Sequence, residues 1–180
     1  MPEDRHSGSD YFRVERHTAA AELLAQVEQA YVLHYRDVYR YVLALTRSAD
    51  DAEEITSETF ERAMRAWDTA PDAVVPWLLL VARRIYVDRW RRTTRWARTL
   101  LHPVRASGEG SDQSRTEFWL WFEAVTRILT PRQREALVLR YQRDLSDADI
   151  AYVMGITESG VRSLVARGLE VLRKHEELWQ

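Results

Sequence analysis

The sequence predicts an all-α protein in which two small helical domains are joined by a flexible linker. Long stretches rich in Ala, Leu, Arg and Glu favour helix, and only six Gly and five Pro occur among the 180 residues. Apolar side chains recur at spacings of three, four and seven residues, the period of an amphipathic helix. Residues 99–115 are rich in Gly, Ser and Pro and form the clearest linker. We therefore expect a flexible N-terminal arm at residues 1–20, a first domain at 21–98 and a second domain at 116–180.

The composition is that of a folded globular protein. Hydrophobic residues make up 46% and charged residues 30%, and the formal net charge is −2. The absence of cysteine excludes disulfide bonds and thiolate metal sites. The first residues, "MPEDRHSGSD", lack the apolar core of a signal peptide, and the longest apolar run, "AVVPWLLLVA", is about half a membrane span. We expect a cytoplasmic protein without membrane insertion.

The first domain is expected to hold three helices. The first begins at about Ala21, and Ser48 is a good N-cap for the second, which should end near Trp67. A loop at residues 68–76 follows, and its last proline suits the first turn of a third helix, which runs from Trp77 into an arginine cluster. The side chains expected to face inward are Leu24, Val27, Tyr31, Val38, Tyr41, Val42 and Leu45, then Ala52, Ile55, Thr59, Phe60 and Ala63, then Leu78, Val81, Ala82 and Ile85.

The second domain should begin with a helix at about residues 116–128. The stretch "TPRQ" at residues 130–133 has the pattern of a capping box with proline in the first turn of the next helix. Ser146 should cap a short helix that Gly155 ends, and Thr157 should cap the last helix.

The last two helices have the spacing of a helix-turn-helix, whose second helix enters the major groove of DNA. Gly155 permits the positive φ of the turn, while Ile156 and Val161 are placed to lock the second helix across the first. An ordinary helical hairpin within a bundle is the alternative. The candidates are the residues expected on the exposed face of the second helix, Thr157, Glu158, Ser159, Arg162, Ser163, Ala166 and Arg167. The polar side chains among them can reach base edges or phosphates.

The third helix of the first domain carries the second indication of nucleic-acid binding. The stretch "RRIYVDRWRRTTRWAR" at residues 83–98 holds seven arginines and one acid, with aromatic residues among them. Cations that follow phosphates beside aromatic platforms for bases are typical of single-stranded nucleic-acid binding. A solvated charged face and a membrane-surface helix are the alternatives, although the single lysine of the chain argues against the latter. The candidates are Trp77, Arg83, Arg84, Tyr86, Arg89, Trp90, Arg91, Arg92 and Arg95.

The second helix is acidic on one face, with seven acids between Asp37 and Glu61. It is either a solvated face or a docking surface for a partner with a basic patch. The candidate docking residues are Asp51, Glu53, Glu54, Ser57, Glu58, Phe60 and Glu61.

Catalysis finds little support in the sequence. The five histidines show no metal-ligand spacing, and no P-loop, "HExxH", "GxSxG" or "GxGxxG" motif is present. We expect no catalytic residue, no metal and no cofactor.

In their order, these segments resemble the extracytoplasmic-function (ECF) sigma factors, the minimal two-domain promoter-specificity subunits of bacterial RNA polymerase. "LHYRDVYRYVLALTRSADDAEEITSETFERAMRAW" is similar to the first part of sigma region 2, and "PWLLLVARRIYVDRWRR" to the segment that follows it. "LTPRQREALVLRYQRDLSDADIAYVMGITESGVRSLVARGLEVLRK" is similar to sigma region 4.

The resemblance implies a sigma region 2-like bundle and a sigma region 4-like helix-turn-helix. The acidic helix would dock on the β′ clamp helices of core RNA polymerase. The loop at residues 68–76 and the arginine helix would hold the −10 element of promoter DNA and capture unstacked bases, whose unstacking costs a few kcal/mol. The second domain would read the −35 element and contact the β flap. An anti-sigma factor is the further partner that the resemblance implies.

Four positions depart from the family's usual pattern. Gln is usual at Ser57, Asn at Arg84, Thr at Gly160 and a basic residue at Leu164. Because the changes at Arg84, Gly160 and Leu164 touch the −10 and −35 surfaces, a sigma-like protein that only binds partners is one alternative. A stand-alone helix-turn-helix regulator that does not bind core polymerase is the other.

Overall fold

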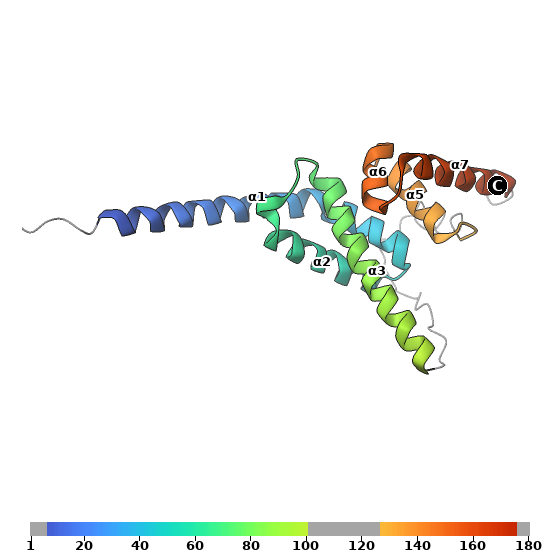
Figure 1. The fold of residues 1–180 in the computed structure, drawn as a ribbon, viewed down its shortest axis with the longest axis horizontal. Helices are drawn as coiled ribbons and strands as arrows, with labels where there is room; N and C mark the ends of the chain where they lie inside the picture. Colours follow the sequence, from blue (N-terminus) through green and yellow to red (C-terminus); the bar gives the residue numbers. More distant parts are fainter. Residues whose placement is uncertain (1–6, 101–126, 176–180) are drawn as a thin grey trace, which may run out of the picture.

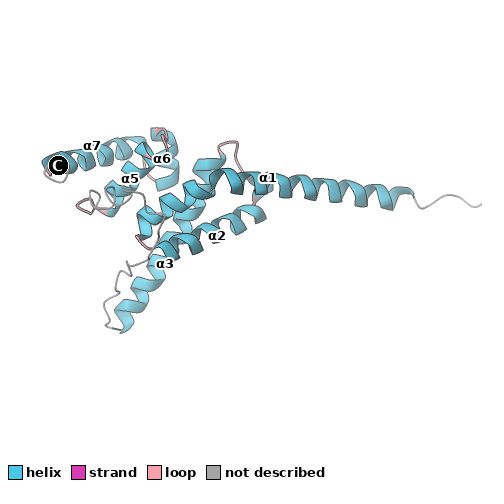
Figure 2. Ribbon diagram, turned by 180° about the vertical axis from the view of Figure 1, so that it is seen from behind, coloured by secondary structure: helices cyan, strands magenta, loops and turns pink. Residues whose placement is uncertain are grey.

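The computed structural model describes the backbone of residues 7–100 and 127–175, and side chains in residues 21–93 and 127–175. These ranges contain no strand, which confirms the all-α class (Figures 1 and 2). The elements are α1 (Ser7–Thr46), α2 (Ala49–Arg65), the single 3₁₀ turn η1 (Trp67–Thr69), α3 (Val74–Leu100), α5 (Pro131–Tyr141), α6 (Asp147–Met154) and α7 (Glu158–Lys174).

The first three helices pack together around side chains that solvent barely reaches. Tyr41, Ile55, Leu78 and Ile85 are each at most 1% exposed. Burying an apolar side chain of this size stabilises a fold by roughly 1.5–3 kcal/mol. The inward face predicted for α2 is confirmed, since Ala52, Ile55, Thr59, Phe60 and Ala63 are all buried.

The predicted apolar stripe of α1 is only partly buried. Val38, Tyr41 and Val42 lie in the core, whereas Leu24 is 59% and Tyr31 44% exposed. Leu24 and Tyr31 line a surface groove between α1 and α2, and ahead of them the N-terminal part of α1 projects away from the other helices (Figure 1).

Several predicted boundaries differ from the structure. Helix α1 begins at Ser7 instead of near residue 21, and α3 begins at Val74 instead of Trp77. The loop expected at residues 68–76 is therefore shortened to residues 70–73, after the turn η1. Proline in the first turn of a helix loses no hydrogen bond, so the helix can start ahead of it. Beyond Leu100, the expected linker and the helix expected at residues 116–128 lie outside the described residues, except that residues 127 and 128 form a turn.

The predicted helix caps are confirmed. The Ser48 hydroxyl accepts from the Asp51 N–H at 3.2 Å, and Ser146 and Thr157 cap α6 and α7 in the same way. Thr130 forms the complete capping box of α5. Such caps each contribute about 1 kcal/mol.

The two halves of the described chain pack on each other. Helix α6 lies against α3, and α5 lies against α1. Ile85 of α3 and Ile150 of α6 are buried in one hydrophobic cluster. The sequence predicts two domains tethered only by a linker. The contact between them could not be predicted, because the pattern within one helix does not reveal which distant helix packs against it.

Candidate nucleic-acid interface

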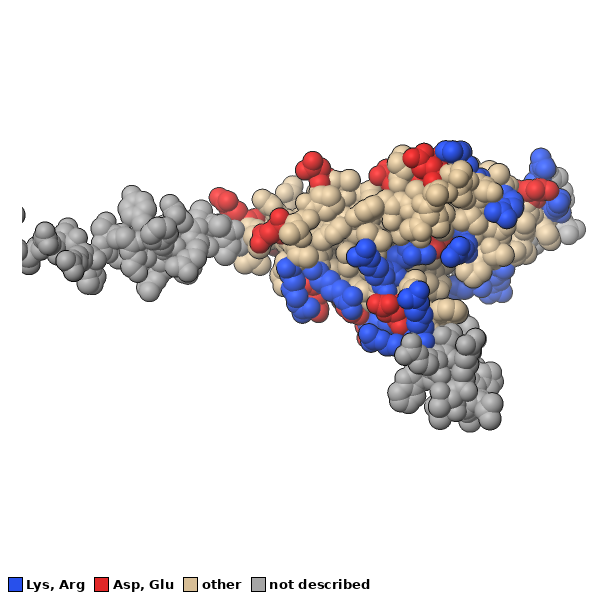
Figure 3. All heavy atoms as spheres, in the orientation of Figure 1, with Lys and Arg blue, Asp and Glu red and all other residues tan. Residues whose placement is uncertain are grey.

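The arginine cluster is distributed around α3 and does not form one surface. Arg84, Arg91 and Arg92 are exposed, and Trp90 beside them is 58% exposed. Figure 3 shows basic side chains gathered over α2 and α3 on one face of the molecule, and in these two helices all of them are arginines. We use the name exposed arginine face for the four exposed residues Arg84, Trp90, Arg91 and Arg92, which lie on more than one side of α3. The side chain of Arg95 lies outside the described side chains.

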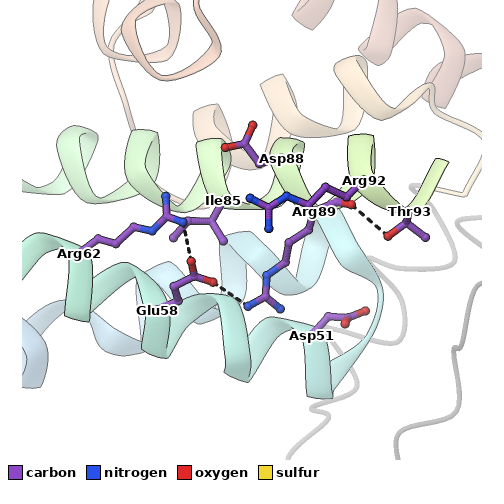
Figure 4. A pocket seen from close by; sticks show the side chains of 8 residues that line it. All are labelled: Asp51, Glu58, Arg62, Ile85, Asp88, Arg89, Arg92 and Thr93. Atoms are coloured by element: carbon purple, nitrogen blue, oxygen red, sulfur yellow. Dashed lines mark hydrogen bonds and ion pairs between the residues drawn. The ribbon is translucent and has the colours of Figure 1, made fainter. Parts of the chain in front are cut away.

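Arg89 points toward the acidic helix. Its Nη1 lies 2.6 Å from Glu54 Oε2 and its Nη2 lies 2.7 Å from Glu58 Oε2. Arg62 donates to the other Glu58 oxygen at 2.6 Å (Figure 4). Hydrogen bonding to Glu54 is the main reason why the pKa of Arg89 is raised. Arg89 therefore joins α3 to α2 within the protein.

The residues Glu58, Arg62 and Arg89 also line a shallow groove of about 420 Å³ between α2 and α3 (Figure 4). Burial acts to raise the pKa of Glu58, but hydrogen bonds from Arg89 and Arg62 outweigh it and lower that pKa. The groove is mixed in charge, and its lining residues are Asp51, Glu58, Arg62, Ile85, Asp88, Arg89, Arg92 and Thr93.

Arg83 and Tyr86 turn toward the second half of the chain. Arg83 Nε lies 2.7 Å from Glu135 Oε1 of α5, and its side chain is 21% exposed. Tyr86 is half-buried, and burial together with the charge of Glu135 raises its pKa. Both residues therefore lie at the contact between the two halves, away from the exposed arginine face.

An aromatic pair stands at the start of α3. The rings of Trp77 and Trp67 meet edge to face with centroids 5.8 Å apart. Trp67 Nε1 donates to Gln26 Oε1 of α1 at 3.1 Å. Sequence reasoning selected Trp77 but missed Trp67 and Gln26. The tryptophan just ahead of the predicted loop was a usable signal, whereas nothing in the sequence linked Gln26 to it.

Helix α7 presents a continuous polar face. All seven candidate DNA-reading residues, from Thr157 to Arg167, are exposed. Arg162 Nη1 lies 3.2 Å from Asp147 Oδ2 and 3.6 Å from Glu158 Oε2. Burial acts to raise the pKa of Asp147, but hydrogen bonds from Arg162 and Arg140 lower it. These pairs hold the arginine at the helix surface, where a competing anion can reach it.

The presence of glycine at position 160 is explained by the geometry of the first turn of α7. The Gly160 N–H donates to the Thr157 hydroxyl at 3.2 Å, and a Cβ there would lie 3.3 Å from that same oxygen. Glycine thus leaves room for the hydroxyl of the cap.

The acidic helix α2 exposes five of its seven candidate docking residues, namely Asp51, Glu53, Glu54, Ser57 and Glu61. Glu58 is half-buried, because Arg62 and Arg89 hold its carboxylate. Phe60 is only 5% exposed, because its ring packs edge to face on Tyr31. We correct its assignment from a partner-contacting residue to a core residue. An apolar groove between α1 and α2 adjoins this surface and is lined by Leu24, Val27, Glu28, Tyr31, Ser57, Phe60, Glu61 and Met64.

Two family models match the chain. The model described as Sigma-70 region 2 matches residues 30–96, and the model described as Sigma-70, region 4 matches residues 127–174. Among curated relatives, the ECF RNA polymerase sigma factor SigC of Mycobacterium tuberculosis is 37% identical over 147 residues, covering 76% of each chain. SigM of Bacillus subtilis is 26% identical over 153 residues, covering 82% of this chain and 93% of the relative.

Solved structures share the fold. The sigma factor RpoE from Bartonella quintana, in complex with the anti-sigma factor NepR, matches with a TM-score of 0.72 at 21% identity. The match covers 84% of this chain and 95% of that chain. Within the described ranges, none of the helices combines the length and apolar character that a bilayer crossing requires.

Proposed function

The chain belongs to the ECF family of RNA polymerase sigma factors, and we propose how its two halves divide the work of promoter recognition. The region 2 and region 4 matches stand in order along the chain. A stand-alone helix-turn-helix regulator is not favoured, because it would have no use for a region 2 domain. Members of this family are not enzymes.

The exposed arginine face is the proposed site for the −10 element. Arg84, Arg91 and Arg92 are exposed, whereas Arg89 is held by two acids of α2. Trp90 and the pair Trp67–Trp77 offer aromatic surfaces on which unstacked bases can rest. Cations for phosphate and rings for bases are the combination that capture of a single strand requires.

The exposed face of α7 is the proposed reader of the −35 element. The single observation that carries this assignment is that all seven polar or small candidates are exposed, six of them on one helix of a helix-turn-helix and Thr157 at its N-cap. Arg162 near the N-terminus of α7 is placed where recognition helices contact base edges. Arg167, one turn beyond Ser163, suits a phosphate contact.

The acidic face of α2 is the proposed docking surface for core polymerase, with the β′ clamp helices as its partner. The exposed carboxylates Asp51, Glu53 and Glu61 fit a basic surface, and the β flap is the expected contact of the second half. An anti-sigma factor is proposed as a second protein partner, as the RpoE neighbour was solved with one. We place the protein in the cytoplasm, where its polymerase partner acts.

One experiment tests the assignment as a whole. The purified protein is mixed with bacterial core RNA polymerase, and the complex is tested for discrete transcript starts on genomic DNA fragments. We expect stable binding and starts that share two conserved elements. Binding without starts would assign the chain to the sigma-like proteins that only bind partners. Duplex DNA binding without polymerase binding would refute the proposal.

A further inference from the structure

A buried polar cluster joins the two halves of the chain. Glu135 of α5 accepts from the Tyr41 hydroxyl of α1 at 2.8 Å and from Arg83 Nε of α3 at 2.7 Å. Tyr41 is fully buried, and the Glu135 side chain is 8% exposed. One carboxylate of the second half is therefore held by two helices of the first.

A second polar contact lies beside it. Arg143, just after α5, donates through Nη2 to Asp37 Oδ2 of α1 at 2.6 Å, and its Nη1 also contacts the other oxygen of the same carboxylate. The two side chains are only 19% and 20% exposed. Two-point contact between a guanidinium and a carboxylate is strong and specific in geometry. The two halves are thus held in one orientation by two separate carboxylates.

The cluster contains more positive than negative charge. Around Tyr86, the charge of Glu135 is opposed by those of Arg134, Arg47 and Arg83. Nε and Nη2 of Arg47 are buried, yet they have no hydrogen-bond partner among the residues that the structure describes. Burying donors without partners is costly, so Arg47 offsets part of the stability that the carboxylate contacts contribute.

We infer that Tyr41, Arg83 and Glu135, with Asp37 and Arg143, form a latch that keeps the free protein closed and withholds Arg83 from nucleic acid. The masking of Arg83 rests on the proposed −10 function of α3. When the latch opens, a phosphate of the captured strand takes the place of the Glu135 carboxylate on Arg83.

The closed arrangement affects the two DNA-binding surfaces differently. Arg83 is occupied by Glu135, and α6 covers part of α3. The candidate face of α7 stays exposed in the same arrangement. The free protein is therefore expected to have its duplex-reading face open while its single-strand site is incomplete.

Closure can be measured as a distance, because the chain has no cysteine of its own. Arg65→Cys on α2 and Leu169→Cys on α7 place donor and acceptor dyes at exposed positions, one on each half. Glu135→Gln removes the charge that holds Arg83 and keeps the side-chain shape. We expect it to lower the energy transfer between the dyes. Glu170→Gln, which removes the same charge from an exposed pair with Lys174, is the matched control and should leave the transfer unchanged.

Exchanging the charges of the Asp37–Arg143 contact distinguishes opening of the latch from a folding defect. Asp37→Arg sets two cations against each other and should open the latch. Adding Arg143→Asp restores an opposite pair and should close it again. Unchanged energy transfer in both Glu135→Gln and Asp37→Arg, with circular dichroism as in the parent protein, would overturn the latch.

The consequence for nucleic acid is tested with a short fluorescein-labelled single-stranded DNA of mixed sequence. If most of the free protein is closed, the opened variants should bind it about fivefold more tightly, since apparent affinity scales with the competent fraction. Opening without tighter binding would overturn the masking of Arg83. The dye distances require no polymerase, so a failure of the proposed sigma function would leave this measurement interpretable.

Discussion

Arg89 on α3 and Glu58 on α2 form an ion pair in which Nη2 and Oε2 are 2.7 Å apart. The pair joins the helix proposed for promoter DNA to the helix proposed for polymerase. Arg89 also holds Glu54, so two of the proposed docking acids are positioned by an arginine of the helix proposed for promoter DNA.

The pair should make stability depend on pH. The pKa of Glu58 is lowered in the folded state, so its contribution is complete above its unfolded pKa and is lost as pH falls through the folded value. We expect the free energy of unfolding to fall between about pH 5 and pH 3, and to fall less steeply in Glu58→Gln. Urea unfolding across that range measures it. Glu61→Gln, from a more exposed and longer pair on the same helix, should retain the parent slope. Identical curves for Glu58→Gln and the parent would contradict the role given to the pair.

The exposed arginine face should matter for promoter opening and not for docking. Replacing Arg91 and Arg92 by alanine should reduce open-complex formation about tenfold and lessen its salt dependence, because contacts to phosphate are lost. Core-polymerase affinity should stay near that of the parent. Permanganate footprinting and a polymerase-binding titration report the two quantities. Alanine at both Arg173 and Lys174, exposed at the end of α7, removes two cations elsewhere and serves as the control. An equal loss of docking and opening would assign Arg91 and Arg92 to the polymerase surface.

Arg162 should contribute to the sequence preference at the −35 element. An arginine that reads a base edge is worth about 1–3 kcal/mol of discrimination, so Arg162→Ala should relax the preference at one base pair. Transcription from a library of promoters randomised at the −35 element measures this. A uniform loss across all sequences would indicate a phosphate contact instead, and an unchanged profile would remove Arg162 from the reading set.

Gly155 should be required for the turn of the helix-turn-helix. Its φ of 64° lies in the left-handed region, and a Cβ there would meet no atom within 4 Å. The cost of Gly155→Ala is therefore a backbone cost, which we expect to be about 1–2 kcal/mol. Gly155→Asn should cost less, because asparagine tolerates this conformation. Thermal unfolding distinguishes the two, and equal melting temperatures for the alanine variant and the parent would contradict the explanation.

The sequence by itself determined the features that depend on near neighbours in the chain. Helical period, the caps at Ser48 and Thr157 and the turn at Gly155 each arise from interactions within about four residues, so the pattern predicts them correctly. The exposed face of α7 follows from the same periodicity. The resemblance of the ordered segments to sigma regions 2 and 4 was readable for the same reason, since both are local patterns.

Only the tertiary structure decided which arginines of α3 are available. Arg83, Arg89 and Arg92 look alike in sequence, yet one binds Glu135, one binds Glu54 and Glu58, and one stays exposed. The physical reason is distance along the chain. The partner of Arg83 lies 52 residues away and that of Tyr41 lies 94 residues away, so the choice depends on how whole helices pack and not on helical period.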